Sequence, residues 1–161
     1  MSTQYILTCS KLSIFRDKKS ILEDINFNIS AGEIIVLLGA NGSGKSTLIK
    51  TIANLIPFQD GTINLLGQDL RAIKRKKLSQ LVSYTAQNND FDLAISVYDF
   101  VSLGRYPFQG IIPIYTEEDK KIIKKALEIT HLEAKSENQI SKLSGGEQQR
   151  ALIARSLATE A

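Results

Sequence analysis

Apolar and polar residues alternate along much of the first third of the chain, and Ile25, Phe27 and Ile29 show the pattern most clearly. A period of two residues is typical of half-buried β-strands. Turns that contain Lys, Asp or Gly separate several segments of this kind. We therefore expect four strands, at residues 5–8, 12–15, 21–29 and 62–66.

Residues 34–38 break this alternation, because they read Ile-Ile-Val-Leu-Leu with no polar position and end at Gly39. A short, continuous apolar run predicts a parallel strand that is covered on both faces. Parallel strands in turn imply helices as their cover. A second strand of this region is predicted at residues 81–85.

Helical spacing of apolar residues predicts several helices. The first should begin near Gly44, stop before Pro57 and carry an apolar stripe of Leu48, Ile49, Ile52 and Ala53. The basic run at residues 71–77 has the spacing of an exposed helix face. Helical spacing returns at Val97 and, after a predicted loop at residues 104–113, continues in a helix that Thr116 should cap. The chain is thus predicted to be an α/β protein.

A glycine-rich string follows the apolar run and matches G-x-x-x-x-G-K-[S/T] at every fixed position: Gly39, Ala40, Asn41, Gly42, Ser43, Gly44, Lys45 and Ser46. It lies between a predicted strand and a predicted helix, which is the context that this motif requires. Glycines let backbone N–H groups approach phosphates, and the helix N-terminus adds its dipole. Lys45 supplies a charge for the β- and γ-phosphates, and Ser46 a hydroxyl for Mg²⁺. The string predicts a site for a nucleoside triphosphate and Mg²⁺, with Thr47 as its next binding residue.

A second helix start with consecutive glycines lies near the end of the sequence, in the string Leu143, Ser144, Gly145, Gly146, Glu147 and Gln148. Ser144 and Glu147 have the spacing of a capping box, which alone would explain a helix start. Capping does not require two glycines, however. Bare N–H groups at a positive helix end predict another anion site.

The string Leu-Ser-Gly-Gly-Glu-Gln resembles the signature motif of ATP-binding cassette (ABC) ATPases, and the resemblance covers essentially all 161 residues. It implies a P-loop fold with an antiparallel β subdomain, a parallel-sheet core and an α-helical subdomain. It assigns residues 1–86 to the β subdomain and P-loop core, 87–142 to the Q-loop and helical subdomain, and 143–161 to the signature helix. It also implies a head-to-tail dimer with a second ATP-binding subunit, whose ATP is contacted in trans by Ser144, Gly145, Gly146 and Glu147.

The resemblance implies three further site residues. Gln87 falls at the Q-loop glutamine, which approaches Mg²⁺ and the attacking water, so that Lys45 and Gln87 are the expected catalytic residues. The match is partial, because the family often reads Leu-Pro-Gln where this chain reads Thr-Ala-Gln. Phe15 or Arg16 falls near the residue that stacks on adenine, by an aromatic or a cation–π contact. Phe15 is slightly favoured, and a core role for its ring is the alternative.

The segment from Val97 to Pro107 resembles importer ATPases for ferric siderophores, haem and cobalamin, chiefly in its Leu-Gly-Arg-Tyr-Pro ending. The resemblance implies membrane permease partners and, indirectly, a substrate-binding protein. It also implies a cytoplasmic location at the inner face of the membrane, reached through the permease. The transported substrate is selected by those partners and cannot be deduced from this chain.

Composition agrees with this interpretation. The formal net charge is only +3, and the basic run at residues 71–77 is better explained as a solvated face, so we expect no nucleic-acid partner. Cys9 is the single cysteine and is expected to be a buried apolar residue rather than a reactive thiol. No apolar run is long enough to cross a bilayer.

The family pattern continues beyond the signature with an apolar strand ending in Asp-Glu, a D-loop and a switch histidine. None of these occurs in the sequence, and His131, the sole histidine, precedes the signature and is expected to be structural. We therefore expect a truncated chain that lacks part of the parallel core and hydrolyses ATP poorly. The alternative to an importer subunit is a catalytically dead nucleotide-binding or dimerisation fragment. A soluble ABC ATPase acting on DNA or ribosomes is disfavoured by the short interval between the two motifs and by the presence of one cassette.

Overall fold

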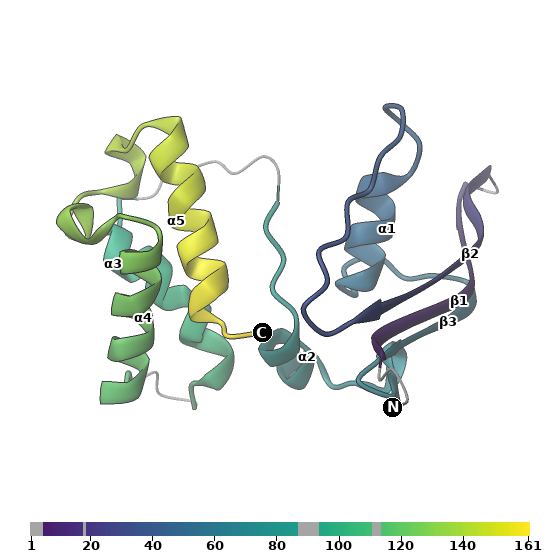
Figure 1. The fold of residues 1–161 in the computed structure, drawn as a ribbon, viewed down its shortest axis with the longest axis horizontal. Helices are drawn as coiled ribbons and strands as arrows, with labels where there is room; N and C mark the ends of the chain where they lie inside the picture. The colour runs from purple at the N-terminus through teal and green to yellow at the C-terminus, as the bar shows by residue number, and fades with distance from the viewer. Residues whose placement is uncertain (1–4, 18, 87–93, 111–113) are drawn as a thin grey trace. The chain divides into compact units, whose positions relative to one another are not determined.

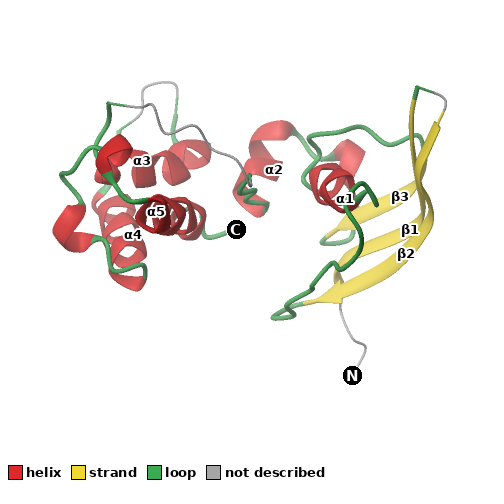
Figure 2. Cartoon of the chain, turned by 90° about the horizontal axis from the view of Figure 1, so that it is seen from above, coloured by secondary structure: helices red, strands yellow, loops and turns green. Residues whose placement is uncertain are grey.

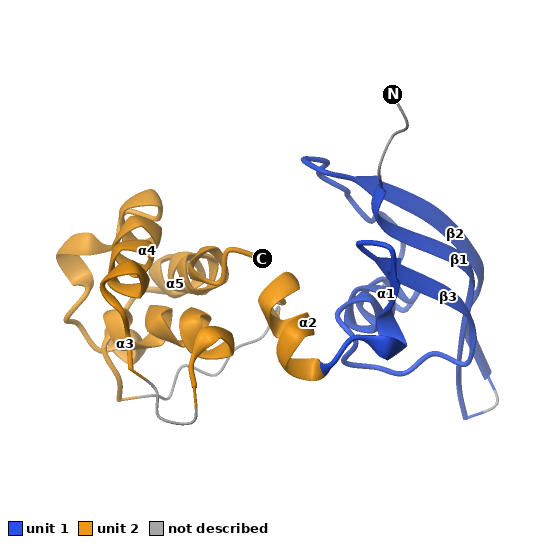
Figure 3. Ribbon diagram, turned by 90° about the horizontal axis from the view of Figure 1, so that it is seen from below, with its two compact units in different colours: residues 1–74 blue, residues 75–161 orange. Residues whose placement is uncertain are grey.

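The computed structural model describes residues 5–17, 19–86, 94–110 and 114–161. The chain divides into two compact units, Met1–Lys74 (unit 1) and Arg75–Ala161 (unit 2), which Figure 3 shows in two colours. Each unit is described by itself below. The predicted three-part division at residues 86 and 142 stays a prediction.

Unit 1 contains an antiparallel sheet with the strand order β2-β1-β3-β4. The strands are β1 (Tyr5–Arg16), β2 (Lys19–Ser30), β3 (Asp60–Leu65) and β4 (Gln68–Asp69), and a short 3-10 helix, η1 (Leu70–Ala72), follows them. The antiparallel sheet is therefore confirmed. Two strands predicted separately, at residues 5–8 and 12–15, form the single long strand β1.

A bulge explains why β1 looked like two strands. Leu7 and Cys9 face the core, and so do Leu12 and Ile14, but the spacing between the two pairs is three residues instead of two. The pairing with β2 shifts register between Cys9 and Leu12, and Lys11 lies there with a φ of 50°. One extra residue thus keeps both halves of the strand facing the same core.

The core of unit 1 confirms two further predictions. Ile25, Phe27 and Ile29 of β2 are half-buried and alternate with exposed residues. Cys9 is 2% exposed, and burial raises the pKa of its thiol to about 11. Such a thiol remains protonated at neutral pH and behaves as a small apolar group.

The buried parallel strand predicted at residues 34–38 is not formed in this structure. The segment carries no strand assignment, and its five side chains are 38% to 91% exposed. Within the described ranges, every strand pairing is antiparallel and none includes these residues. An apolar run becomes a parallel strand only where neighbouring strands pair with it and helices cover it.

The predicted glycine-loop helix is present as α1 (Lys45–Ile52), which stands beside the sheet (Figures 1 and 2). It buries Leu48 and Thr51. The helix ends at Ile52, five residues before Pro57, because Ala53 has left helical geometry.

Unit 2 is all-helical in the part that the structure describes. It contains α2 (Arg75–Leu81), α3 (Val97–Ser102), α4 (Glu117–Ile129) and α5 (Gly145–Ala158). Three 3-10 helices join them: η2 (Leu103–Phe108), η3 (Glu133–Lys135) and η4 (Ile140–Lys142). Helices α3, α4 and α5 enclose one apolar core (Figure 1), which includes Val97, Phe100, Ile123, Leu127 and Leu152.

Two predictions for unit 2 are corrected. Residues 81–85 form no strand, because Leu81 is the last residue of α2 and Val82 still donates to the carbonyl of Leu78. The predicted loop at 104–113 begins as the helix η2, where Gly104 and Arg105 are buried. Residues 111–113 of that loop lie outside the described residues.

The capping predictions are confirmed. Thr116 and Asp119 form a capping box at the start of α4, and Ser144 and Glu147 form one at the start of α5. His131 follows α4 with a φ of 55°, and its N–H donates to the carbonyl of Glu128. A residue with this left-handed backbone directly after the C-cap ends the helix, which is a structural role for His131. No helix in the described part of the chain is long and apolar enough to span a membrane.

Candidate functional site

The glycine-rich loop at residues 39–46 leads into α1, and Gly44 is the residue that makes the junction possible. Gly44 is the N-cap residue of α1 and has a φ of 87°. A Cβ at this position would lie 2.8 Å from Cδ2 of Leu22, so both the backbone angle and the space favour glycine. Among the residues that the structure describes, no side chain caps the helix, which leaves its first N–H groups open to an anion.

Lys45 lies folded over this loop. Its Nζ donates to the carbonyl oxygens of Gly39 and Ala40, each at 2.7 Å. The loop itself is closed by the N–H of Ser43, which donates to the carbonyl of Ala40 at 3.2 Å. An ammonium group held by two neutral carbonyls at an exposed site can exchange them for phosphate oxygens, which bind it more strongly.

The remaining loop residues stay accessible. Asn41, Gly42 and Ser43 are exposed, Ser46 is exposed on the first turn of α1, and Thr47 is half-buried. A single hydroxyl such as that of Ser46 suits Mg²⁺, which usually combines one or two protein ligands with substrate phosphates and waters. The described residues contain no group of three His, Cys, Asp or Glu that could hold a metal by itself. Gln87, the other predicted metal and catalytic residue, lies outside the described residues.

A cavity of about 380 Å³ lies where the end of β1 approaches α1. Phe15 and Arg16 line it together with Thr47, so the structure brings three of the predicted site residues to one cavity. Phe15 is 37% exposed, and its N–H donates to Oε1 of Gln59 at 3.0 Å. Gln59 is a wall residue that the sequence patterns did not suggest. A cavity with apolar walls and a few polar groups is suited to a flat organic ring.

The second predicted site lies at the start of α5, in unit 2. Oε2 of Glu147 accepts from the N–H of Ser144 at 2.9 Å and from its hydroxyl at 2.8 Å. The other carboxylate oxygen, Oε1, pairs with Nζ of Lys135. The Lys135 hydrogen bond first, and then those from Ser144, lower the pKa of Glu147 to about 2. One oxygen of Glu147 thus holds Ser144, and the other is engaged by Lys135.

This arrangement leaves the helix start itself open. Ser144, Gly145 and Gly146 are exposed, and a Cβ on either glycine would meet no atom within 4 Å. The N-terminus of a 14-residue helix is a favourable place for an anion. The structure supports Glu147 as a residue that orients the start of α5.

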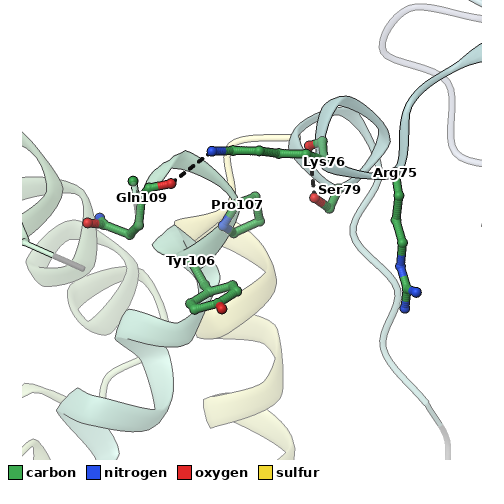
Figure 4. Close-up of a pocket in the computed structure, with 7 residues that line it drawn as sticks. Arg75, Lys76, Ser79, Tyr106, Pro107 and Gln109 are labelled. Atoms are coloured by element: carbon green, nitrogen blue, oxygen red, sulfur yellow. Dashed lines mark hydrogen bonds between the residues drawn. The ribbon is translucent and has the colours of Figure 1, made fainter. Parts of the chain in front are cut away.

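Sequence reasoning missed a groove on unit 2. It has a volume of about 390 Å³ and is lined by Arg75, Lys76, Ser79, Tyr106, Pro107, Gln109 and Gly110. Figure 4 shows Lys76 reaching across to the carbonyl of Gln109, a hydrogen bond of 2.9 Å. Tyr106 is 68% exposed beside it. The sequence predicts a solvated face for the basic run and a loop for the Tyr-Pro segment, and no periodicity joins two such distant stretches.

Sequence reasoning also missed the role of Arg105, which lies in the segment that carries the importer resemblance. Its Nε donates to Oδ1 of Asp119 at 2.8 Å, and only 8% of either side chain is exposed. Arginines are rarely buried without a carboxylate partner. A lone Arg in an apolar stretch of the sequence therefore indicates that a buried Asp or Glu lies elsewhere in the chain.

The chain matches a protein family described as ABC transporter over residues 22–161. It is 35% identical to the iron(3+)-hydroxamate import ATP-binding protein FhuC of Bacillus subtilis, over 94% of the chain and 56% of that protein. It is 37% identical to the manganese transport system ATP-binding protein MntB of the same organism, over 89% of the chain and 56% of that protein. The chain therefore spans about half the length of the curated relatives it matches.

A solved structure shows the same fold. The protein cbiO1 of Clostridium perfringens, part of the ABC transporter complex cbiONQ, is 30% identical and superposes with a TM-score of 0.83. The match covers 98% of this chain and 62% of that one.

Proposed function

Since this chain belongs to the ABC transporter family, we propose that it is the ATP-binding part of an importer. In this proposal the loop at residues 39–46 holds the phosphates of ATP. The observation that carries it is the pairing of two features of the described residues: an N-terminus on α1 that none of their side chains caps, and a Lys45 ammonium that two loop carbonyls hold. Both features place positive charge where phosphates would lie.

The proposal gives separate parts in binding to Lys45, to Ser46 and to the residues of the adjoining cavity. Lys45 would leave the carbonyls of Gly39 and Ala40 for the β- and γ-phosphate oxygens. Ser46 would supply a hydroxyl to Mg²⁺, whose charge offsets that of the phosphates. The cavity beside Phe15, Arg16 and Thr47 would take the adenine ring. Gln87 is proposed to approach the metal and the attacking water.

We propose that the start of α5 acts on the ATP of a second subunit. Its support is chemical: Ser144, Gly145 and Gly146 present a hydroxyl and bare N–H groups at an exposed helix N-terminus. Glu147 would act indirectly, by holding Ser144. ATP would then join two copies head to tail, since each copy carries one half of each site.

The transported substrate is proposed to be a ferric siderophore or a related metal chelate such as haem or cobalamin. The Leu-Gly-Arg-Tyr-Pro segment and the similarity to an iron(3+)-hydroxamate importer support this class. A relative of similar identity is a manganese transport protein, so the metal differs among the relatives. The chain would work at the cytoplasmic face of the membrane with permease subunits and, through them, a substrate-binding protein.

The groove on unit 2 is proposed to receive a segment of the permease. Its exposed ring, Tyr106, offers apolar area, and Arg75 offers a positive charge at the rim (Figure 4). Such a surface fits a partner segment with an apolar face and an acidic side chain.

We also propose that residues 34–38 form a strand of the parallel core when pairing strands are available. These five consecutive apolar side chains are 38% to 91% exposed, so burying them under neighbouring strands and helices would be favourable. The run leads directly into the phosphate-binding loop, which is where α/β folds bind nucleotides.

Hydrolysis by these 161 residues is proposed to be weak. Hydrolysis in the family uses an Asp-Glu pair that orients water, and the sequence contains no such pair. The chain would then bind ATP and associate without turning it over rapidly. Steady turnover that Lys45→Ala abolishes would reject this part of the proposal.

Nucleotide affinity tests the proposed function. A fluorescent ATP analogue with Mg²⁺ is titrated into the chain and into Lys45→Ala, with Lys50→Ala as the matched control, because Lys50 is a lysine exposed on the same helix. We expect Lys45→Ala to weaken binding about a hundredfold, as loss of a charged hydrogen bond to phosphate would, and Lys50→Ala to leave it unchanged. Equal affinities for all three proteins would reject the loop as the binding site.

A further inference from the structure

Arg105 connects three segments of unit 2 from a buried position, where it is 7% exposed. Besides its bond to Asp119 on α4, its Nη1 donates to the carbonyl oxygen of Ala158 at 3.0 Å and to Oε2 of Glu160 at 3.1 Å. Its guanidinium lies over the ring of Phe108, 4.1 Å from the centroid. One side chain therefore joins η2, the first turn of α4 and the end of α5.

The backbone of η2 touches the same end of α5 directly. A Cβ on Gly104 would lie 2.3 Å from the carbonyl oxygen of Arg155 and 3.0 Å from Cβ of Ala158. Glycine is needed here because no side chain fits between the two backbones. The end of α5 is thus held by a contact through Gly104 and by hydrogen bonds from Arg105.

Hydrogen bonds continue from η2 to the groove. Nζ of Lys76 donates to the carbonyl of Gln109, and Nε2 of Gln80 donates to that of Pro107 at 3.0 Å. The side chain of Gln109 also reaches Oδ2 of Asp119 at 3.4 Å. One groove residue, Gln109, therefore shares the carboxylate that Arg105 binds.

We propose that Arg105 is a positioning residue, which makes the groove on unit 2 and the helix α5 move as one rigid body. The inference rests on the proposed function, in which a permease occupies the groove and the start of α5 meets a partner's ATP. Ala158 and Gly145 are the two ends of α5, whose 14 residues make a helix about 21 Å long at about 1.5 Å each. A shift of η2 would be passed to Ala158 and carried along the helix to Ser144.

The planar fork of arginine is essential to this role. It donates in fixed directions to Asp119, Ala158 and Glu160 together, whereas a lysine ammonium is a point charge on a flexible chain. Arg105→Lys keeps the charge and removes the fixed geometry.

Distance measurement between two spin labels tests the proposal without nucleotide, so that its failure differs from a failure of ATP binding. In a Cys9→Ser background, labels are placed at Tyr106→Cys on the groove and at Gln149→Cys, an exposed position on α5. Arg71→Lys is the matched control, because Arg71 also stacks over a ring and pairs with an aspartate, but in unit 1.

We expect a narrow distance distribution in the parent and in Arg71→Lys, and a clearly broader one in Arg105→Lys. Nucleotide affinity should be the same in all three, since the phosphate-binding loop lies in unit 1. An unchanged distribution in Arg105→Lys, even with a lower melting temperature, would reduce Arg105 to a stabilising residue and overturn the proposal.

If Arg105→Lys does not fold, the same distance measurement is made on Glu160→Gln. It weakens one acceptor, whose side chain is 56% exposed, and keeps Asp119 and Ala158 in place. The expected result is a smaller broadening of the same distribution. An unchanged width in this folded variant would also overturn the proposal.

Discussion

Nε of Arg105 lies 2.8 Å from Oδ1 of Asp119, and both side chains are 8% exposed. Asp119 also accepts from the N–H and the hydroxyl of Thr116, at 2.9 and 2.8 Å. One carboxylate therefore caps α4 and neutralises the buried guanidinium. Burial alone would raise the pKa of Asp119, but the hydrogen bonds from Arg105 and Thr116 outweigh it and hold the pKa at about 2.

Asp119→Asn should destabilise the chain by about 3 kcal/mol at pH 7, because it leaves a buried guanidinium without its counter-charge. Because the pKa of Asp119 is lower in the folded chain than in the unfolded chain, its ionised carboxylate stabilises the fold at pH values above about 4. This stabilisation is lost as the pH falls from about 4 toward 2. The difference in the free energy of unfolding between the parent and Asp119→Asn, measured in urea, should therefore shrink over that interval. Glu118→Gln, at an exposed pair, is the control and should cost less than about 1 kcal/mol. A gap that is constant from pH 5 to pH 2 would contradict the assignment.

Gly104→Ala should destabilise unit 2 by about 2 kcal/mol, because the new Cβ would lie 2.3 Å from a backbone oxygen of α5. Gly110→Ala is the matched control, since a Cβ there meets nothing within 4 Å. Thermal unfolding of both variants measures the difference. Equal melting temperatures would mean that η2 does not touch α5 as described.

Glu147→Gln should loosen the first turn of α5. The pKa of Glu147 is lowered to about 2, chiefly by Lys135 and then by Ser144, so its contribution is present above pH 4.5 and is lost as the pH falls toward 2. Amide hydrogen exchange at Glu147 and Gln148, whose N–H groups bond to Ser144, should become faster in the variant at pH 7. The exposed residue Glu137 provides the control Glu137→Gln, which should leave these amides unchanged.

Phe15→Ala and Arg16→Ala should separate the two candidates for the adenine contact. Loss of a base stack costs about 1–3 kcal/mol, or roughly a 5- to 150-fold loss of ATP affinity. Inorganic tripolyphosphate carries no base, so its affinity should stay unchanged in the variant that removes the stack. The residue whose loss weakens ATP but spares tripolyphosphate is the stacking residue. If neither variant shows this pattern, the cavity at Phe15 does not hold the base.

Local signals in the sequence were reliable where a residue's own neighbours decide its structure. The capping boxes at Thr116 and Ser144, the glycine turn before α1 and the alternation in β2 all rest on contacts a few residues long. The bulge at Lys11 was not predicted, because it merges two alternating segments whose register depends on the partner strand. Sequence alone suggested two strands there.

Signals that depend on distant partners were less reliable. The run at residues 34–38 is apolar enough for a buried strand, but a strand also needs neighbours, and the described residues supply none. The groove joins residues about 30 positions apart, as the Lys76–Gln109 bond shows. The Arg105–Ala158 bond spans 53 positions, and no period in the sequence reveals such a contact.

The most direct test of the account is ATP-dependent association, because its central claim is that one chain carries halves of two ATP sites. Sedimentation velocity is measured with and without MgATP for the parent, for Ser144→Arg and for Gln149→Arg, an exposed control position on the same helix. We predict that ATP converts the parent and the control to dimers, while Ser144→Arg binds the nucleotide and stays monomeric. A Ser144→Arg protein that dimerises with ATP as readily as the parent would contradict the account.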